Sequence, residues 1–215
     1  MRYVVFFVPR EGIHPCASLE DYSKLWPIMH RSVKRLGHEL VHLTDKVTPC
    51  MGDSVHRVDV DPATTIYSRD VAWRDYVASL PDGEQACMIE PDTYMLRSIP
   101  PIADGFDMVL LRRPYKVIPG WFKLATNRAI PFYDRVLREW EAFTGDLRVF
   151  HGDIGALHRA CSIPDGESAH TIPEIVDGVR IESRDWWRYG FRKADNRPYF
   201  LQFKGESKAD MLRLR

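Results

Sequence analysis

The sequence predicts one α/β domain, residues 1–215, in which helices cover both faces of a mainly parallel central sheet. Two observations lead to this three-layer fold class. Short continuous runs of β-branched and aromatic residues, typical of strands buried on both faces, recur along the chain. Amphipathic helical patterns separate several of these runs, as the crossovers between parallel strands require. A hydrophobic content of 45% over 215 residues is sufficient for one substantial core.

Each expected element has a local signal. The expected strands are residues 3–8, 38–45, 54–60, 87–89, 106–111 and 121–127. The expected helices repeat apolar residues at helical spacing over residues 18–36, 68–80 and 130–143. Ser18 caps the first helix and Gly37 closes it, while Pro27 either kinks or splits it. The second helix is expected to turn charged side chains largely away from its buried side: Arg69, Asp70, Arg74 and Asp75.

Composition excludes several classes of protein. The 30 basic and 30 acidic residues cancel, so the overall charge indicates no polyanionic partner. The four cysteines are scattered without a CxxC pair, which predicts neither a zinc site nor a disulfide framework and favours a reducing cytoplasm. The apolar run at 3–8 is too short for a signal-peptide core or a membrane span, so we expect a soluble, cytoplasmic protein without a membrane partner.

Two carboxylates stand at the end of a predicted strand, in the segment Cys87-Met88-Ile89-Glu90-Pro91-Asp92. The carboxyl ends of strands are where open α/β sheets bind their ligands. Side chains two apart on a regular strand share a face without converging, and Pro91 favours the turn that would bring Glu90 and Asp92 together. Taken alone, the pair is more often a solvated loop than a metal site.

Later in the chain, Asp153 lies between Gly152 and Gly155, just before a short helical piece. Here the backbone can approach a ligand closely, or Asp153 can simply cap the helix. Residues 184–215 are rich in basic and aromatic side chains. We expect this segment to close over the ligand site.

Three segments together resemble the GT-A glycosyltransferases, which use sugar-nucleotide donors, and in particular the glycogenin-like and retaining galactosyltransferase-like branch. EQACMIEPDTYML is similar to the strand that leads to the metal-binding DxD motif of that family, with Glu90 in place of the first aspartate. RVFHGDIGAL is similar to the segment that carries an acid before a helix, here Asp153. YFLQFKGESK is similar to the closing HFxGxxK motif, with Gln202 in place of histidine. The segments occur in the family's order, and the resemblance spans roughly residues 65–208.

The resemblance implies a hexosyltransferase-like enzyme that moves a sugar from a nucleotide-diphosphate sugar, most simply a UDP-sugar, to an acceptor hydroxyl. It implies Mn²⁺ or Mg²⁺ as cofactor, because a divalent ion neutralises the diphosphate leaving group. The implied metal ligands are Glu90, Asp92 and Gln202, of which Gln202 offers only a neutral carbonyl oxygen. Asp153 would be the catalytic residue, as nucleophile, base or hydroxyl-orienting acceptor. The implied donor-binding residues are Arg69, Gly205 and Lys208.

Two alternatives remain open from the sequence. One is a non-catalytic module that keeps the fold to bind nucleotides or nucleic acid, favoured by the changes at Glu90 and Gln202 and by the basic, aromatic tail. The other concerns the acceptor, which can be a small molecule, a glycan, a protein or a modified base in DNA. A DNA acceptor would need a local basic patch, for which the candidates outside the tail are Arg112, Arg113, Lys116, Lys123 and Arg128.

Overall fold

The computed structural model describes residues 1–9, 19–112, 122–145, 152–164, 171–185, 198–203 and 207–214. An eight-stranded sheet runs through the molecule in the order β3-β2-β1-β4-β7-β6-β9-β8. Its strands are β1 (Arg2–Phe6), β2 (Leu40–Thr44), β3 (Ser54–Arg57), β4 (Ala86–Met88), β6 (Met108–Arg112), β7 (Lys123–Ala125), β8 (Ile175–Val176) and β9 (Val179–Asp185). A separate two-stranded sheet pairs β5 (Thr93–Met95) with β10 (Phe200–Gln202).

The large sheet is mainly parallel, as the sequence predicts. Strand β1 pairs in parallel with β2 and β4, β2 with β3, and β6 with β9. Strand β7 runs antiparallel between β4 and β6, and the short β8 runs antiparallel to β9. This topology brings the carboxyl ends of β1 and β4 to the same edge, where an open α/β sheet binds its ligands.

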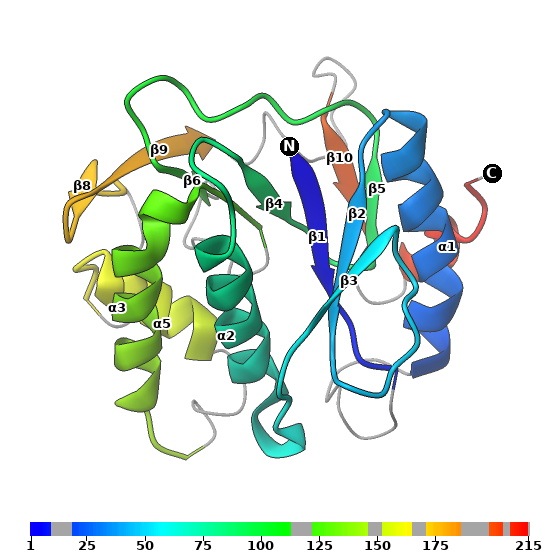
Figure 1. The fold of residues 1–215 in the computed structure, drawn as a ribbon, viewed down its shortest axis with the longest axis horizontal. Helices are drawn as coiled ribbons and strands as arrows, with labels where there is room; N and C mark the ends of the chain where they lie inside the picture. The colour runs from blue at the N-terminus through cyan, green and yellow to red at the C-terminus, as the bar shows by residue number, and fades with distance from the viewer. Residues whose placement is uncertain are drawn as a thin grey trace.

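Helices cover both faces of this sheet (Figure 1). Helices α2 (Thr65–Ala78), α3 (Ile130–Glu141) and α5 (Gly152–Ala160) lie on one side, and α1 (Leu19–Arg35) lies on the other. Alternate residues of β1 divide accordingly, with Val4 and Phe6 in one hydrophobic core and Tyr3 and Val5 in the other. The short α7 (Lys208–Met211) packs near α1 through Met211. The predicted three-layer architecture is confirmed.

The first two helices differ in detail from the expectation. Helix α1 is one continuous helix with Pro27 inside it, so the proline does not split it, and Gly37 follows its end with a φ of 77°. Helix α2 does not keep all its charges outside, because Asp70 is only 1% exposed and Arg69 has a side-chain exposure of 12%. The prediction that these two residues face away from the buried side was therefore wrong. Among the described helices, none has the length and apolar character needed to span a bilayer.

Candidate active site

The Glu90–Asp92 pair occupies a tight turn at the carboxyl end of β4. The backbone N–H of Ile89, one residue past the end of β4, still donates to the carbonyl oxygen of Val4, at 3.0 Å between N and O. The turn is then closed by the N–H of Thr93, which donates to the carbonyl oxygen of Glu90 at 3.0 Å. Beyond it the chain enters β5. The break in the strand that Pro91 predicts is therefore present.

The partner of β5 comes from the far end of the chain. Strand β10 runs antiparallel to β5 and sets Gln202 opposite Thr93. Phe203 then donates its N–H to the backbone oxygen of Asp92 at 2.9 Å, and the Asp92 side chain is buried. Gln202 donates Nε2–H to Glu90 Oε2 at 2.9 Å. The residue at the expected third ligand position thus contacts the first acid of the pair, although it presents its amide nitrogen to that acid.

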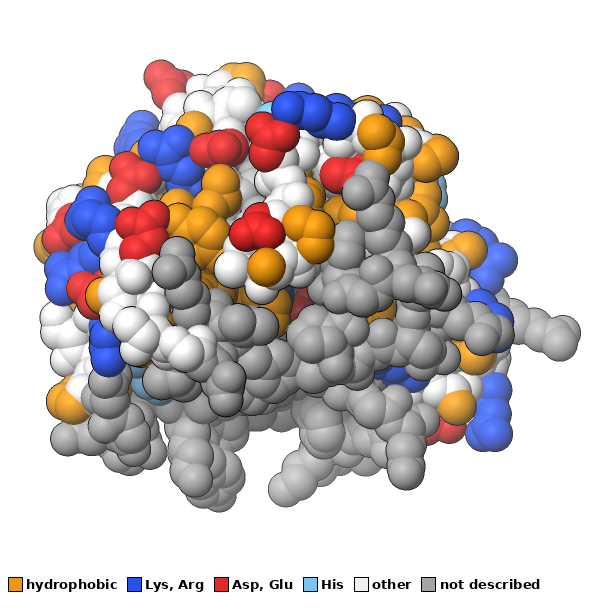
Figure 2. Space-filling view, turned by 90° about the horizontal axis from the view of Figure 1, so that it is seen from below, with side chains coloured by type: hydrophobic (Ala, Val, Ile, Leu, Met, Phe, Trp, Pro, Cys, Tyr) orange, Lys and Arg blue, Asp and Glu red, His pale blue; other side chains and the backbone are white. Residues whose placement is uncertain are grey.

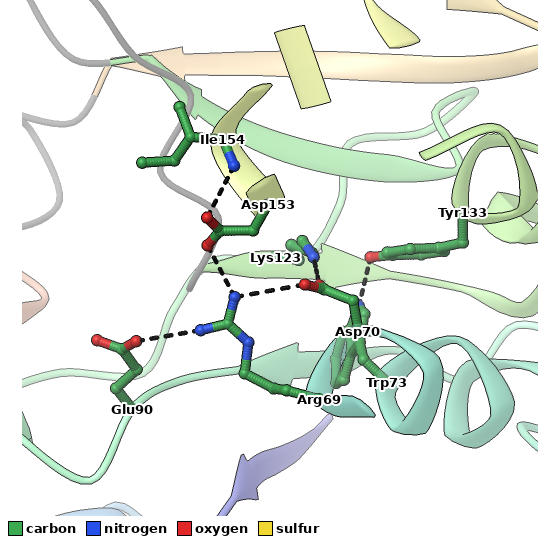
Figure 3. A network of polar contacts seen from close by, with 8 residues as sticks. All are labelled: Arg69, Asp70, Trp73, Glu90, Lys123, Tyr133, Asp153 and Ile154. Atoms are coloured by element: carbon green, nitrogen blue, oxygen red, sulfur yellow. Dashed lines mark hydrogen bonds and ion pairs between the residues drawn. The ribbon is translucent and has the colours of Figure 1, made fainter. Parts of the chain in front are cut away.

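Arg69 is the centre of the polar network drawn in Figure 3. Its Nη2 lies 2.8 Å from Asp153 Oδ2 and 3.4 Å from Asp70 Oδ2, and its Nη1 lies 3.4 Å from Glu90 Oε1. Burial disfavours the guanidinium charge, but the carboxylates of Asp70, Asp153 and Glu90 outweigh burial and raise the pKa of Arg69. Arg69 therefore stays charged and joins three acids from separate parts of the chain.

Asp153 is the second residue of α5 rather than a residue before it. One carboxylate oxygen accepts from Arg69, and the other accepts from the N–H of Ile154 at 2.8 Å, so both oxygens are held in place. Gly155 allows the helix to lie close to the end of α3, because a Cβ there would come within 2.8 Å of Phe143 Cζ. This glycine serves helix packing, and the packing brings Asp153 to the site.

A second pair of charges lies beneath Arg69 and is not among the sequence-predicted site residues. Lys123, the first residue of β7, is fully buried and forms an ion pair with Asp70. Its ammonium group also lies 5.6 Å from the ring centroid of Tyr133, whose hydroxyl accepts from Trp73 Nε1. Burial lowers the pKa of Lys123, and the adjacent Asp70 opposes that shift. A lysine within the apolar run Phe122–Ala125 was the available signal for this pair.

A small pocket adjoins the network at the carboxyl end of β1. Its lining includes Arg69 and Glu90 from the network, and otherwise Phe6, Phe7, Tyr22, Thr65, Ile66 and Pro91. The ammonium group of Lys208 lies 4.1 Å from the ring centroid of Tyr22, which brings this predicted donor-binding residue to the pocket wall. Gly205, the remaining predicted donor-binding residue, lies outside the described residues.

The basic patch considered for DNA binding is only partly supported. Lys123 is buried, so its assignment to a surface patch was wrong, and Arg112 pairs with Asp185 at 2.7 Å. Arg128 is exposed, whereas Arg113 and Lys116 lie outside the described residues. Figure 2, which views the side towards which β1 points in Figure 1, shows acidic and basic side chains interspersed along the margin of that face.

The donor set is compatible with a divalent cation. Within the described ranges, no group of three or more His, Cys, Asp or Glu side chains is arranged to bind a metal. The expected set is different, with two carboxylates and one amide, all hard oxygen donors of the kind that Mg²⁺ and Mn²⁺ accept. Among the described residues named at this edge, the acids still outnumber the cations: the acids are Asp70, Glu90, Asp92 and Asp153, and the cations are Arg69, Lys123 and Lys208. A positive ion would offset that excess.

Comparisons with known proteins show the class of fold. The sequence matches no protein-family model and no curated protein. The structure is similar to a glycosyltransferase involved in the glycosylation of the major capsid of PBCV-1, with a TM-score of 0.61 and 10% identity, covering 99% of this chain and 97% of that one. This chain has the fold of the GT-A glycosyltransferases.

A second similar structure is the glycosyltransferase GlyE of Streptococcus pneumoniae TIGR4. Its TM-score is 0.59 at 11% identity, and the match covers 96% of this chain and 55% of GlyE. The apo form of GlyE matches with a TM-score of 0.56 at 10% identity. The chain therefore spans about half the length of GlyE. The resemblance stated from the sequence is confirmed at the level of the fold.

Proposed function

We propose that this protein is a metal-dependent glycosyltransferase that moves a sugar from a nucleotide-diphosphate sugar, most simply a UDP-sugar, to an acceptor hydroxyl. One observation carries the proposal. Arg69, Glu90, Asp153 and Gln202 come from four separate parts of the chain and meet at the carboxyl edge of the sheet, in a glycosyltransferase fold. A solvated loop at Glu90 would not account for this convergence.

The pocket beside the network supports binding of the donor nucleotide. Aromatic side chains from β1 and α1 form its apolar part, and Arg69 and Glu90 form its polar end. At about 70 Å³ the pocket is too small to enclose a nucleoside diphosphate, but it combines an aromatic wall with charged groups, the kinds of group that contact a base and phosphates. Lys208, held over the Tyr22 ring, is one cation available to the phosphates.

Glu90 and Asp92 would hold the metal ion, with Gln202 supplying its amide oxygen if the amide is turned to present Oε1. When bound, the ion supplies positive charge that stabilises the departing nucleoside diphosphate. Arg69 would keep Glu90 in place from the other side, through its contact with Oε1. The excess of carboxylates at this edge supports such an ion.

Asp153 would orient the transferred sugar. Each of its oxygens already accepts one hydrogen bond from the protein and retains a lone pair for a sugar hydroxyl. Because both oxygens are fixed, the carboxylate offers a preorganised acceptor, which favours catalysis by positioning.

The decisive experiment is a panel of nucleotide sugars incubated with the protein and Mn²⁺ or Mg²⁺, with release of the nucleoside diphosphate as the readout. We expect at least one donor to be turned over, by transfer or slow hydrolysis, only when metal is present. Glu90→Ala and Asp92→Ala should each abolish that turnover. Turnover of a donor by either variant at the wild-type rate would show that these acids are misassigned.

Failure across the whole panel would refute a transferase. Equal binding of UDP with and without divalent metal, measured by calorimetry and without turnover of any donor, would instead identify a non-catalytic nucleotide-binding module. The acceptor is addressed separately, by adding small molecules, glycans, proteins or DNA to the reaction with the active donor and detecting the added sugar by mass spectrometry. DNA is excluded as the acceptor if it does not bind, or if its binding does not depend on the salt concentration.

A further inference from the structure

The buried pair of Asp70 and Lys123 has no part in the donor, metal or acceptor roles assigned above. Asp70 is 1% exposed and Lys123 is fully buried, so neither reaches a substrate from solvent. Burying two charges is costly, and replacing such a pair by apolar residues is often neutral or stabilising. A purely structural account therefore gives little reason for an ion pair at this place.

The contacts of Asp70 suggest what the pair does. Asp70 Oδ1 binds the Lys123 ammonium, while Oδ2 lies 3.4 Å from Arg69 Nη2. The same Nη2 makes the 2.8 Å contact with Asp153. Asp70 is thus shared between two cations, and Arg69 Nη2 is shared between two acids. Figure 3 shows the continuous sequence of contacts from Lys123 to Asp153.

The secondary structure explains why this arrangement is possible. Arg69 and Asp70 are adjacent on α2, so their side chains leave the helix in different directions. Lys123 is delivered by the antiparallel β7, where it stands opposite Met88 of β4 and Leu110 of β6. The antiparallel strand β7 therefore places Lys123 beneath α2, the helix that carries Arg69.

We infer that Asp70 and Lys123 are positioning residues, a buried ion pair that holds the Arg69 guanidinium across Asp153 and Glu90. This inference rests on the proposed function for its effect on turnover, but its geometric part does not. Lys123 binds one oxygen of Asp70 and neutralises much of its charge. The Arg69 guanidinium can therefore contact Asp153 as well as Asp70. Without Lys123, Asp70 is a buried carboxylate whose nearest described cation is Arg69, and the guanidinium should move towards it.

The test compares Asp70→Asn and Lys123→Met with the wild-type protein. Asp70→Asn keeps the shape of the side chain and removes its charge, and Lys123→Met keeps most of the side-chain volume. A matched control is the double variant Lys46→Met, Asp59→Asn, which removes an exposed ion pair of 2.6 Å whose two residues have no role assigned here. Each protein is assayed for melting temperature, kcat, donor KM and the Arg69–Asp153 distance in a crystal structure.

We expect Lys123→Met to lengthen the contact between Arg69 and Asp153 and to lower kcat by roughly tenfold or more, since misplaced catalytic groups cost rate before affinity. Asp70→Asn should also lower kcat, with the donor KM within about threefold of wild type. Lys123→Arg keeps the positive charge, so its kcat should lie between that of Lys123→Met and that of wild type. If Lys123→Met does not fold, Asp70→Asn carries the test. The exposed control pair should leave all four measurements unchanged.

Two outcomes would overturn the inference. The first is a folded Asp70→Asn or Lys123→Met protein with a lower melting temperature but wild-type kcat, because that is the signature of a purely structural pair. The second is an unchanged Arg69–Asp153 contact in the crystal structures of both variants. Lack of turnover by the wild-type protein with every donor would instead count against the proposed function, and the crystallographic distances would still decide the positioning role.

Discussion

Replacing Arg69 by methionine should strongly destabilise the protein, because three acids depend on the guanidinium. Methionine keeps an unbranched apolar stem but is shorter than arginine, so the substitution removes the charge, the donors and the volume of the guanidinium. Asp153 loses its 2.8 Å contact and Asp70 and Glu90 lose theirs at 3.4 Å. These side chains are 1–19% exposed, so water can replace the guanidinium only in part.

The magnitude follows from this burial. Removing one partner of a buried ion pair costs about 3–5 kcal/mol, because the remaining charge is left without its counterion. Asp153 and Glu90 retain some access to water, which places the expected loss near the lower end, at roughly 3 kcal/mol. Arg74→Met on the same helix is the matched control. Arg74 contacts Asp134 at 2.8 Å, but its side chain is 33% exposed, so the loss should be at most about 1 kcal/mol.

Urea unfolding at neutral pH, followed by tryptophan fluorescence and by circular dichroism, measures both losses in the free energy of unfolding. The two variants should have the same dependence of unfolding free energy on urea as wild type, since the exposed surface is unchanged. An Arg69→Met loss no larger than the Arg74→Met loss would refute the reasoning. It would mean that the three acids are served by water or by other groups, and that Arg69 does not organise the site.

Three further predictions concern the site and its support. Glu90→Gln and Asp92→Asn should each lower metal-dependent turnover of the donor by on the order of a hundredfold or more, measured by release of the nucleoside diphosphate. The melting temperature of the metal-free protein should stay close to that of wild type, because the lost activity reflects lost metal binding and not unfolding. Lys208→Met should weaken UDP binding by about fivefold in calorimetry, since one partly exposed cation is worth about 1 kcal/mol. Burial lowers the pKa of His42 from 6.5 to about 4. The unfolded chain therefore binds more protons than the folded protein between these pH values. The free energy of unfolding of the wild-type protein should fall by up to about 3 kcal/mol as the pH drops through that window. His42→Gln should remove most of this pH dependence, and an unchanged pH profile in the variant would contradict the assignment to His42.

The elements that the sequence predicts best are those with a local cause. Strand β1 is a continuous apolar run that must be buried on both faces, and α3 has an apolar stripe that must face the sheet. Strand β9 escaped prediction because only Val179 and Ile181 in its sequence, VRIESRD, are apolar, and the third buried position is a charged residue, Arg184. Strands β5 and β10 have three residues each and exist only through their pairing across more than a hundred residues of chain. No local pattern of that length specifies a strand.

The candidate site divides in the same way. Glu90 and Asp92 have a local signal, an apolar run that ends in acids, and the structure places them at a strand end as expected. The meeting of Arg69 with Asp153 has no local signal, since 84 positions separate them. The family resemblance assigned both residues to one site without predicting their contact. Asp70 was assigned to the solvent side because charge on an amphipathic helix is normally exposed. Its partner Lys123 lies on a distant strand, so the periodicity of the helix gives no sign of their contact.

The buried charges bear on the proposal that the donor binds at this edge of the sheet together with a metal ion. Arg69 and Lys123 are positive and each is already engaged by acids, whereas Lys208 at the pocket wall contacts the Tyr22 ring. Among the described side chains at this edge, the acids still outnumber the cations when Lys208 is counted, which would favour a divalent ion. A diphosphate that arrives with its metal ion brings the missing positive charge. The electrostatic balance of the network therefore favours the metal-bound form of the donor, in agreement with the proposed metal dependence, and it makes Glu90 rather than Arg69 the group through which that dependence should be tested.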